Sequence, residues 1–350
     1  MAFTIKDAIQ AVVAGRDLSV EESAAAMSQL MTGEATPGQV GAFLAALRMK
    51  GETPEEIAGM ARVMREKSLH VGYNGRLVDT CGTGGDGRKT FNISTAAAFV
   101  VAGAGLAVAK HGNRAASSSS GSADVLERLG VKIGLGPEGV RRCLDEVGIG
   151  FMFAQAFHPA MKFVGPVRRE IGIRTVFNLL GPLTNPAGAR AQVIGVAEEG
   201  LADRVARAVA LLGTDHAFVV HGADGSDEIA VKGTSTVWQV KGGDVKKRRA
   251  DPAAFGLPDG DPAHLGAADA GESAAIVNAV LAGKGGGHNF PASPERSRRA
   301  AVVINAAAAL VAGERAGSFQ ESAELAMKSI DSGAAAAKLA SLATLSQALT

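Results

Sequence analysis

The chain has 350 residues, a length typical of two or three domains. Glycine accounts for 45 residues, 47% of the residues are hydrophobic, and 36 basic against 35 acidic residues leave a formal net charge of +1. This hydrophobic content excludes general disorder, the lack of a three-residue glycine period excludes collagen, and two cysteines are too few for a disulfide scaffold. The near-neutral charge gives no general attraction to nucleic acid or to a membrane.

Residues 90–109 carry no charge and are about long enough to span a membrane. Their Ala and Gly content, with Asn92, Ser94 and Thr95 at one end, predicts instead a buried helix followed by a buried strand. The N-terminus has no basic segment followed by an apolar one, so we expect no signal peptide. With only two cysteines, the protein suits a reducing compartment, and we expect it in the cytoplasm, with no membrane or nucleic-acid partner.

Residues 1–72 contain repeated helix starts and no strand pattern. Thr53 precedes Pro54 and lies three residues before Glu56, which satisfies the free N–H groups of a helix start. Ser19 and Thr36 begin similar patterns. These signals predict a small all-helical domain over residues 1–72.

From residue 77 onward, short apolar runs alternate with helical patterns. We expect strands at residues 77–78, 106–109, 131–133, 192–196 and 217–220, and helices at residues 122–129, 137–147 and 201–212. The alternation predicts an α/β domain over residues 73–350, with a mainly parallel central sheet flanked by helices on both faces. The basic segment 241–249 fits a solvated hairpin or loop better than a nucleic-acid patch, and the last eighty residues are helical.

A glycine-rich segment, residues 79–87, directly follows the first predicted strand. Its glycines let the backbone approach a ligand and point N–H groups at an anion. Gly82, Gly84 and Gly87 fit the dinucleotide pattern G-x-G-x-x-G, but the next strand ends in Lys110 where an acid would bind a ribose diol. The segment therefore suits a phosphate, and a glycine-rich turn without a ligand is the alternative.

Two further polar segments suit a phosphate as well. Residues 90–95 precede the Ala-rich helix, where their hydroxyl and amide groups either cap the helix or bind an anion. Residues 110–122 supply Lys110, Arg114 and a serine run between a strand and a helix, which favours a phosphate-binding loop over a plain linker. His111 taken alone is more often structural than catalytic.

Acidic residues follow the strand predicted at residues 217–220. Asp227 and Glu228 are adjacent, and adjacent carboxylates on a loop are commonly a solvated turn. At the carboxyl end of a strand beside phosphate loops they suit Mg²⁺, which prefers a few carboxylates plus substrate oxygens. No Cys or His spacing supports zinc. Arg168 is either a surface residue or a clamp for a carboxylate substrate.

Taken in order, these segments resemble the anthranilate phosphoribosyltransferase family. The matching segments are residues 82–86, 92–95, 110–114, 121–127, 177–186 and 227–228. Ser119 and Ser226 depart from the pattern we expect, but neither removes a group to which we assign chemistry.

The resemblance implies transfer of the phosphoribosyl group of 5-phosphoribosyl 1-diphosphate to the amine of anthranilate, with release of diphosphate, in tryptophan biosynthesis. It implies a nucleoside phosphorylase-like fold in which helices from about residues 165–190 join the helical domain. It also implies two Mg²⁺ per subunit and a homodimer built through the helical part. Catalysis would come mainly from positioning and charge, with Lys110, Asp227 and Glu228 as the electrostatic candidates.

By position, the resemblance also implies the site residues. The donor would contact Gly82, Gly85, Asp86, Thr90, Asn92, Ile93, Ser94, Thr95, Lys110, His111, Gly112, Asn113, Arg114, Ala115, Ala116, Ser117, Ser118 and Ser122. Anthranilate would contact Gly82, Asn113 and Arg168. One magnesium would be held by Ser94 and Glu228, and a second by Asp227 and Glu228.

Two other functions remain open at this point. A pyrimidine-nucleoside phosphorylase shares the fold and a phosphate loop, although residues 110–113 fit that class poorly. A non-catalytic relative could bind nucleic acid through its basic loops, but it would be expected to have a basic chain or disrupted acids.

Overall fold

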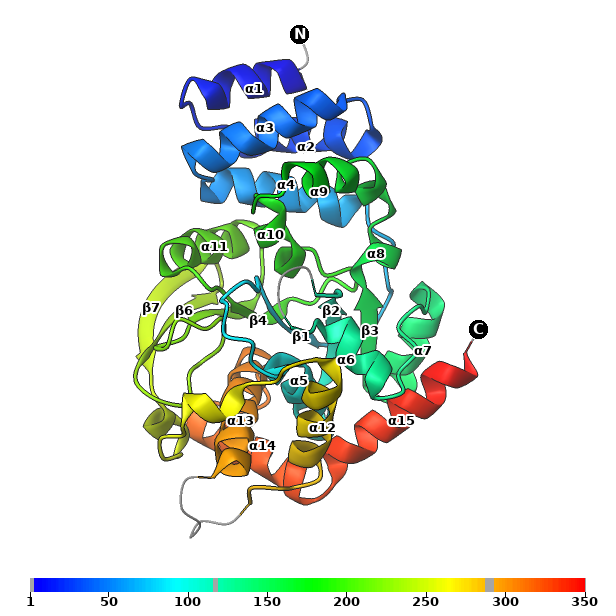
Figure 1. The fold of residues 1–350 in the computed structure, drawn as a ribbon, viewed down its shortest axis with the longest axis vertical. Coiled ribbons are helices and arrows are strands. Elements are labelled where there is room, and N and C mark those ends of the chain that lie inside the picture. The colour runs from blue at the N-terminus through cyan, green and yellow to red at the C-terminus, as the bar shows by residue number, and fades with distance from the viewer. Residues whose placement is uncertain (1–2, 116–118, 287–292, 350) are drawn as a thin grey trace.

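The computed structural model describes residues 3–115, 119–286 and 293–349. At one end of the molecule lie the N-terminal helices α1 (Ile5–Val13), α2 (Val20–Thr32), α3 (Pro37–Lys50) and α4 (Pro54–Glu66) (Figure 1). Each begins with a capping box, in which the Thr or Ser before the helix and the third helical residue exchange side-chain and backbone hydrogen bonds. The helix starts predicted at Ser19, Thr36 and Thr53 are therefore confirmed.

The rest of the chain is built on a seven-stranded sheet of order β3-β2-β1-β4-β5-β6-β7. Its strands are β1 (Leu77–Gly82), β2 (Ala107–Gly112), β3 (Ile149–Phe153), β4 (Ala191–Gly195), β5 (His216–His221), β6 (Ser235–Lys241) and β7 (Asp244–Ala250). The first five in spatial order are parallel, and β6 and β7 are antiparallel. The mainly parallel sheet is confirmed, and the basic segment forms the turn and the exposed strand β7 of the β6–β7 hairpin, whereas β6 is largely buried.

The strand predicted at residues 131–133 is wrong, and the edge strand β3 was not predicted. Val131 and Ile133 are buried, but they lie in an irregular connection that packs on the C-terminal helix. There Lys132 donates from its backbone N–H to Ser346 Oγ (3.0 Å) and from Nζ to the Leu349 carbonyl (2.7 Å). Because its backbone N–H bonds to a side chain, this apolar alternation reflects packing against a helix and not pairing in a sheet.

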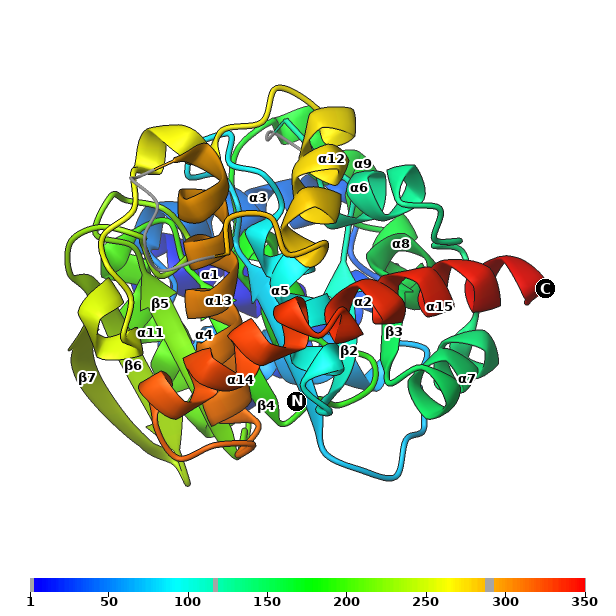
Figure 2. The ribbon, with the colours of Figure 1, turned by 90° about the horizontal axis from the view of Figure 1, so that it is seen from below.

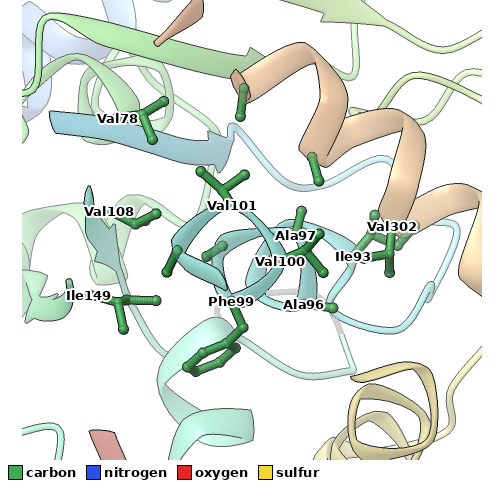
Figure 3. Packing of buried hydrophobic residues seen from close by; sticks show 14 of the residues in the cluster. Val78, Ile93, Ala96, Ala97, Phe99, Val100, Val101, Val108, Ile149 and Val302 are labelled. Atoms are coloured by element: carbon green, nitrogen blue, oxygen red, sulfur yellow. The ribbon is translucent and has the colours of Figure 1, made fainter. Parts of the chain in front are cut away.

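Helices cover both faces of the sheet. On one face, α5 (Ile93–Gly103) packs on the strands, with the last helices outside it (Figure 2). Figure 3 shows Phe99, Val100 and Val101 of α5 among Val78, Val108 and Ile149 of the strands, all buried. The other face packs against α11 (Glu199–Leu211), and α11 in turn packs against α4 of the N-terminal helices, in a second core.

The remaining helices complete these layers. They are α6 (Ser122–Arg128), α7 (Pro137–Glu146), α8 (Ala154–Phe157), α9 (Gly165–Ile171), α10 (Phe177–Leu180), α12 (Ala270–Leu281), α13 (Pro294–Ala312), α14 (Phe319–Asp331) and α15 (Ala334–Ala348). Short 3-10 helices lie at Pro159–Lys162, Gly181–Leu183, Pro252–Phe255 and Pro262–Leu265. Both α9 and α10 pack against the N-terminal helices (Figure 1). No helix in the described part of the chain is long and apolar enough to cross a membrane.

Candidate active site

The polar segments singled out in the sequence meet at one edge of the sheet. Because β1, β2, β4 and β5 are parallel, their carboxyl ends lie at the same edge. Strand β1 lies between β2 and β4, so the strand order reverses there, and such a switch point is where ligands bind in open parallel sheets. The loops that follow β1, β2 and β5 carry the glycines, the serine run and the acidic pair.

Asp227 joins the glycine loop to the acidic loop. Its Oδ2 accepts a hydrogen bond from the Gly84 backbone N–H at 2.8 Å. A Cβ on Gly82 would collide with the carboxylate of Asp227, and a Cβ on Gly195 would collide with its backbone carbonyl. These two strand-end glycines therefore allow the acidic loop to lie directly against β1 and β4.

The acidic pair lies on a tight turn, as the sequence requires if both carboxylates are to serve one site. Gly225 has a φ of 85°, and the Gly222 N–H donates to the Ser226 carbonyl at 2.9 Å. Ser226 is buried, and its Oγ donates to Asp224 Oδ1 at 2.7 Å. The unexpected serine therefore stabilises the turn that presents Asp227.

Lys110, Ser94 and Glu228 form a second polar group beside this turn. Lys110 is buried at the end of β2, and its Nζ donates to the Thr80 carbonyl (2.6 Å) and to Ser94 Oγ (3.4 Å). The Ser94 backbone N–H, at the start of α5, donates to the Glu228 carboxylate. Burial lowers the pKa of Lys110, whereas the nearby Asp79 and Glu228 carboxylates raise it.

The carboxyl groups at this edge lie in a half-buried cluster of like charge. Burial and, to a smaller extent, the charge of Asp86 together raise the pKa of Asp227 to about 6. Burial likewise raises the pKa of Glu228, and the charges of Asp227 and Asp86 act in the same direction. Oδ2 of Asp86 is buried without a hydrogen-bond partner. Three half-buried carboxylates with so few hydrogen-bond donors suit a bound cation.

The acids do not form a complete metal site by themselves. In the described ranges, no three His, Cys, Asp or Glu side chains are grouped so as to hold a metal ion. Asp227, Glu228 and the Ser94 hydroxyl would leave coordination positions to water and to substrate oxygens. Mg²⁺ prefers such an incomplete protein shell when it binds with a phosphate.

Asn92 ties three segments together at the start of α5. Its Oδ1 accepts hydrogen bonds from Ser120 Oγ (2.7 Å) and Ser273 Oγ (2.8 Å), so it joins the serine loop and α12 to α5. Its side chain does not cap α5, which removes the simple capping interpretation. The Thr95 Oγ1 is buried without a partner, whereas the Ile93 side chain lies in the core, so Ile93 could meet a donor only through its backbone.

The side chains of His111 and Arg114, in the segment 110–122, already contact other groups of the protein. The Nδ1 of His111 lies 3.1 Å from the Gly181 carbonyl, and its Nε2 lies 3.2 Å from Nε2 of His158. Burial lowers the pKa of His111 to about 3 and that of His158 to about 4, so both imidazoles are neutral at pH 7. Arg114 pairs with Asp124 (2.9 Å) and Glu127. We therefore expect His111 to meet a donor through its backbone, and Arg114 to do so only if its ion pairs open.

The remaining predicted residues fall around this edge. Gly112 lies against Ser122, leaving no room for a Cβ, and the Asn113 carbonyl accepts from the Ala123 N–H at 3.2 Å. The isolated pairing of Thr90 with Gly266 anchors the end of the first loop. Ala116, Ser117 and Ser118 lie outside the described residues.

Arg168 lies on α9, half-buried, with its guanidinium carbon 5.0 Å from the centre of the Phe177 ring. Burial lowers its pKa, and among the described residues it makes no hydrogen bond to Gly82 or Asn113. Arg174 was not predicted as a site residue, yet its guanidinium donates to the Gly84 carbonyl (3.1 Å) and lies where a Cβ on Gly85 would be. The positive φ of Gly85 (76°) is the local signal for such a close approach.

Comparison with known proteins identifies the family. The sequence model described as "Glycosyl transferase family, a/b domain" matches residues 74–336, and "Glycosyl transferase family, helical bundle domain" matches residues 6–68. The anthranilate phosphoribosyltransferase of Chloroflexus aurantiacus (strain J-10-fl) is 56% identical, and the match covers 98% of this chain and 99% of that protein. The anthranilate phosphoribosyltransferase of Roseiflexus sp. (strain RS-1) is 55% identical, and the match covers 98% of both chains. The chain belongs to the anthranilate phosphoribosyltransferase family.

Solved anthranilate phosphoribosyltransferases share the fold over nearly the whole chain. That of Thermus thermophilus superposes with a TM-score of 0.89 at 42% identity, covering 97% of this chain and 99% of the other. That of Saccharomyces cerevisiae, in complex with PRPP and Mg, gives a TM-score of 0.88 at 28% identity, covering 99% and 98%. A further structure of the yeast enzyme is a complex with 4-fluoroanthranilate.

Proposed function

We propose that this chain is a pentosyltransferase that transfers the phosphoribosyl group of 5-phosphoribosyl 1-diphosphate to the amine of anthranilate, in tryptophan biosynthesis. The products are N-(5-phosphoribosyl)anthranilate and diphosphate. The observation that carries this function is the meeting of the glycine loop, Lys110 and the acidic pair at the switch point of the sheet, in a chain that belongs to this enzyme family.

The donor would lie across the loops that follow β1 and β2 and the start of α5. Backbone N–H groups of the glycine loop, together with those at the α5 N-terminus, suit its phosphate oxygens. The proposed contacts are Gly82, Gly85, Asp86, Thr90, Asn92–Thr95, Lys110–Arg114, Ala115 and Ser122, joined by Ala116, Ser117 and Ser118 outside the described residues. Lys110 would supply the positive charge, since its Nζ already lies at the Ser94 hydroxyl.

Magnesium would be held by the acidic turn. Two ions per subunit fit the residues: Ser94 with Glu228 for one, and Asp227 with Glu228 for the other. The raised pKa values of both carboxyls and the orphaned Asp86 oxygen support a cation there. When bound, the metal would neutralise diphosphate oxygens and so favour departure of that group.

Anthranilate would bind between Gly82, Asn113 and Arg168. A planar guanidinium can bind a carboxylate with two hydrogen bonds, and Arg168 stacks on Phe177 with no competing ion pair in the described part of the chain. Its partial burial makes such an ion pair stronger than one on the open surface.

The chain need not supply a strong base for this reaction. An aromatic amine is neutral and nucleophilic, so the protein's tasks are to align it with the ribose carbon and to hold the charged groups in place. Of the histidines near the loops, His111 and His158 bond to each other and to the protein, which leaves neither free to take the amine proton, and Nδ1 of His221 lies 2.9 Å from the Val196 carbonyl. Electrostatic stabilisation by Lys110 is the main contribution we assign to a side chain.

We further propose a homodimer formed through the helical part, in the cytoplasm. Residues 1–72 would form the helical domain, joined by helices from about residues 165–190, and residues 73–350 the catalytic domain. Val13 and Met49 support a partner surface, because their side chains on α1 and α3 are 69% and 88% exposed. Both cysteines are free thiols, in keeping with a reducing compartment.

Loss of anthranilate fluorescence tests the proposed reaction and the nearest alternative together. The purified chain should consume anthranilate only when both 5-phosphoribosyl 1-diphosphate and Mg²⁺ are present. It should not release thymine from thymidine in phosphate buffer. Phosphorolysis of thymidine without anthranilate turnover would instead favour a pyrimidine-nucleoside phosphorylase.

A further inference from the structure

One cavity of the molecule shares no residue with the proposed active site. It has a volume of about 270 Å³ and lies between α13, α14 and residues 256–260. The two helices pack side by side, as Figures 1 and 2 show. Its walls are formed by described residues, whereas residues 287–292, which follow Gly286 at its edge, lie outside the described ranges.

A buried arginine faces this cavity with part of its donor capacity unused. Arg299 is 7% exposed, and its Nη2 donates to Asp331 at 2.8 Å. Its Nη1 is buried and has no hydrogen-bond partner. An unpartnered charged donor costs more than a neutral one when water is excluded, so an anion bound at Nη1 would be strongly favoured.

The rest of the cavity is suited to an apolar body. Leu257, Val303 and Met327 line it together with Ala300, next to the guanidinium. The volume is slightly below the range of about 300–1,000 Å³ typical of drug-sized ligands, which indicates a small molecule. Asp259 and Asp331 also line the cavity and balance the charges of Arg296 and Arg299, so the lining has no excess positive charge to offset a doubly charged phosphate. A singly charged carboxylate meets less repulsion.

We propose that this cavity binds a small carboxylate with an apolar body. The carboxylate accepts a hydrogen bond from Nη1 of Arg299, and the body packs against Val303 and Met327. The inference does not depend on the proposed enzyme activity, because the two sites have no residue in common.

The methyl resonance of Met327 provides a direct test. The full chain is labelled with ¹³C at its nine methionine methyl groups, and the Met327 signal is assigned by Met327→Leu. The probe is 4-methylpentanoate, and 4-methylpentanamide is the matched uncharged control. The carboxylate should shift the Met327 resonance saturably at millimolar concentration, whereas the amide should leave it nearly unmoved.

Three variants separate this site from nonspecific binding. Arg299→Gln should lower the affinity for 4-methylpentanoate at least tenfold, since a hydrogen bond to a charged group contributes about 1.5–3 kcal/mol. Arg298→Gln is the matched control, because Arg298 does not line the cavity and donates to the His264 carbonyl. Leu257→Trp should block binding by filling the cavity without disturbing the Arg299–Asp331 pair. It decides the question if Arg299→Gln does not fold.

The proposal is overturned if the carboxylate does not move Met327, if the amide moves it equally, or if Leu257→Trp binds as the wild type does. Wild-type affinity in a folded Arg299→Gln variant would have the same consequence.

Discussion

Asp227 and Glu228 differ from the solvated acidic turn that is the simplest interpretation of two adjacent acids on a loop. Both residues are half-buried, and Asp227 accepts a backbone hydrogen bond from the glycine loop. Their raised pKa values mean that the protein holds these charges at a cost unless a cation neutralises them. Removing the charges of Asp227 and Glu228 is therefore a direct test of the proposed metal role.

Replacing the pair by Asp227→Asn and Glu228→Gln should abolish most activity. The substitutions keep side-chain size and an acceptor for the Gly84 N–H, so the fold should persist, but two negative charges near the diphosphate are lost. Turnover should fall by orders of magnitude, and raising the Mg²⁺ concentration should restore part of it. Steady-state assays across a magnesium titration, with circular dichroism to check folding, measure both effects.

Two surface acids on or beside α11 provide the control. Asp203→Asn with Glu198→Gln removes the same charge from side chains that are about half exposed. This control should behave as the wild type. Unchanged magnesium dependence in the Asp227→Asn, Glu228→Gln variant would falsify the metal assignment.

Arg168→Ala should weaken the binding of anthranilate without weakening the binding of the donor. Loss of a charge-assisted hydrogen bond costs about 1.5–3 kcal/mol, so the apparent KM for anthranilate should rise about tenfold or more. Arg169→Ala, an exposed residue of the same helix, is the matched control. Initial rates with each substrate varied in turn measure the effect. A rise in the KM of the donor alone would move the acceptor site elsewhere.

At the scale of elements, the end of β4 positions the acidic loop. Gly195→Ala would place a Cβ onto the backbone carbonyl of Asp227, so the loop must move. We expect a large loss of activity and a higher magnesium requirement. Gly200→Ala in α11 has open space around the added methyl group and should retain activity, with equal or greater stability. Activity assays and denaturant unfolding of both variants test the difference, and wild-type activity in Gly195→Ala would contradict this role.

Local sequence signals predicted helices and strands well where the hydrogen bonds join residues close together in the sequence. The N-terminal helices start at their capping residues because those bonds lie within three residues. The failure at residues 131–133 has a distant cause, since Lys132 bonds to α15 more than 200 residues later in the chain. Strand β3 begins directly after Gly148, which ends α7 with a φ of 85° and N–H bonds to the Cys143 and Leu144 carbonyls, so this glycine was a local signal that the prediction did not use.

The candidate site was predictable as a set of loops but not as a set of contacts. Parallel strands bring their carboxyl ends together, so the glycine, serine and acidic segments had to meet. Sequence spacing gives no sign that Ser273 of α12 would bond to Asn92, or that Arg174 would lie against Gly85. It also could not tell that the Arg114 charge is taken up by Asp124 and Glu127.

For the molecule as a whole, the helical part is the surface on which we propose that a second copy binds. The exposed Val13 and Met49 side chains should be covered in a homodimer. Light scattering of the purified chain at micromolar concentration should give twice the chain mass of 35.4 kDa. Val13→Asp with Met49→Asp should shift the protein toward monomer, and a wild-type monomer would contradict the dimer.

Product analysis tests whether the chain forms the phosphoribosyl adduct of anthranilate. Anthranilate, 5-phosphoribosyl 1-diphosphate and Mg²⁺ are incubated with the purified chain, and the products are followed by mass spectrometry and ³¹P NMR. We expect N-(5-phosphoribosyl)anthranilate and diphosphate in equal amounts, with neither product formed when the donor or the enzyme is omitted. Release of diphosphate without the anthranilate adduct, or no reaction with the folded protein, would contradict this expectation.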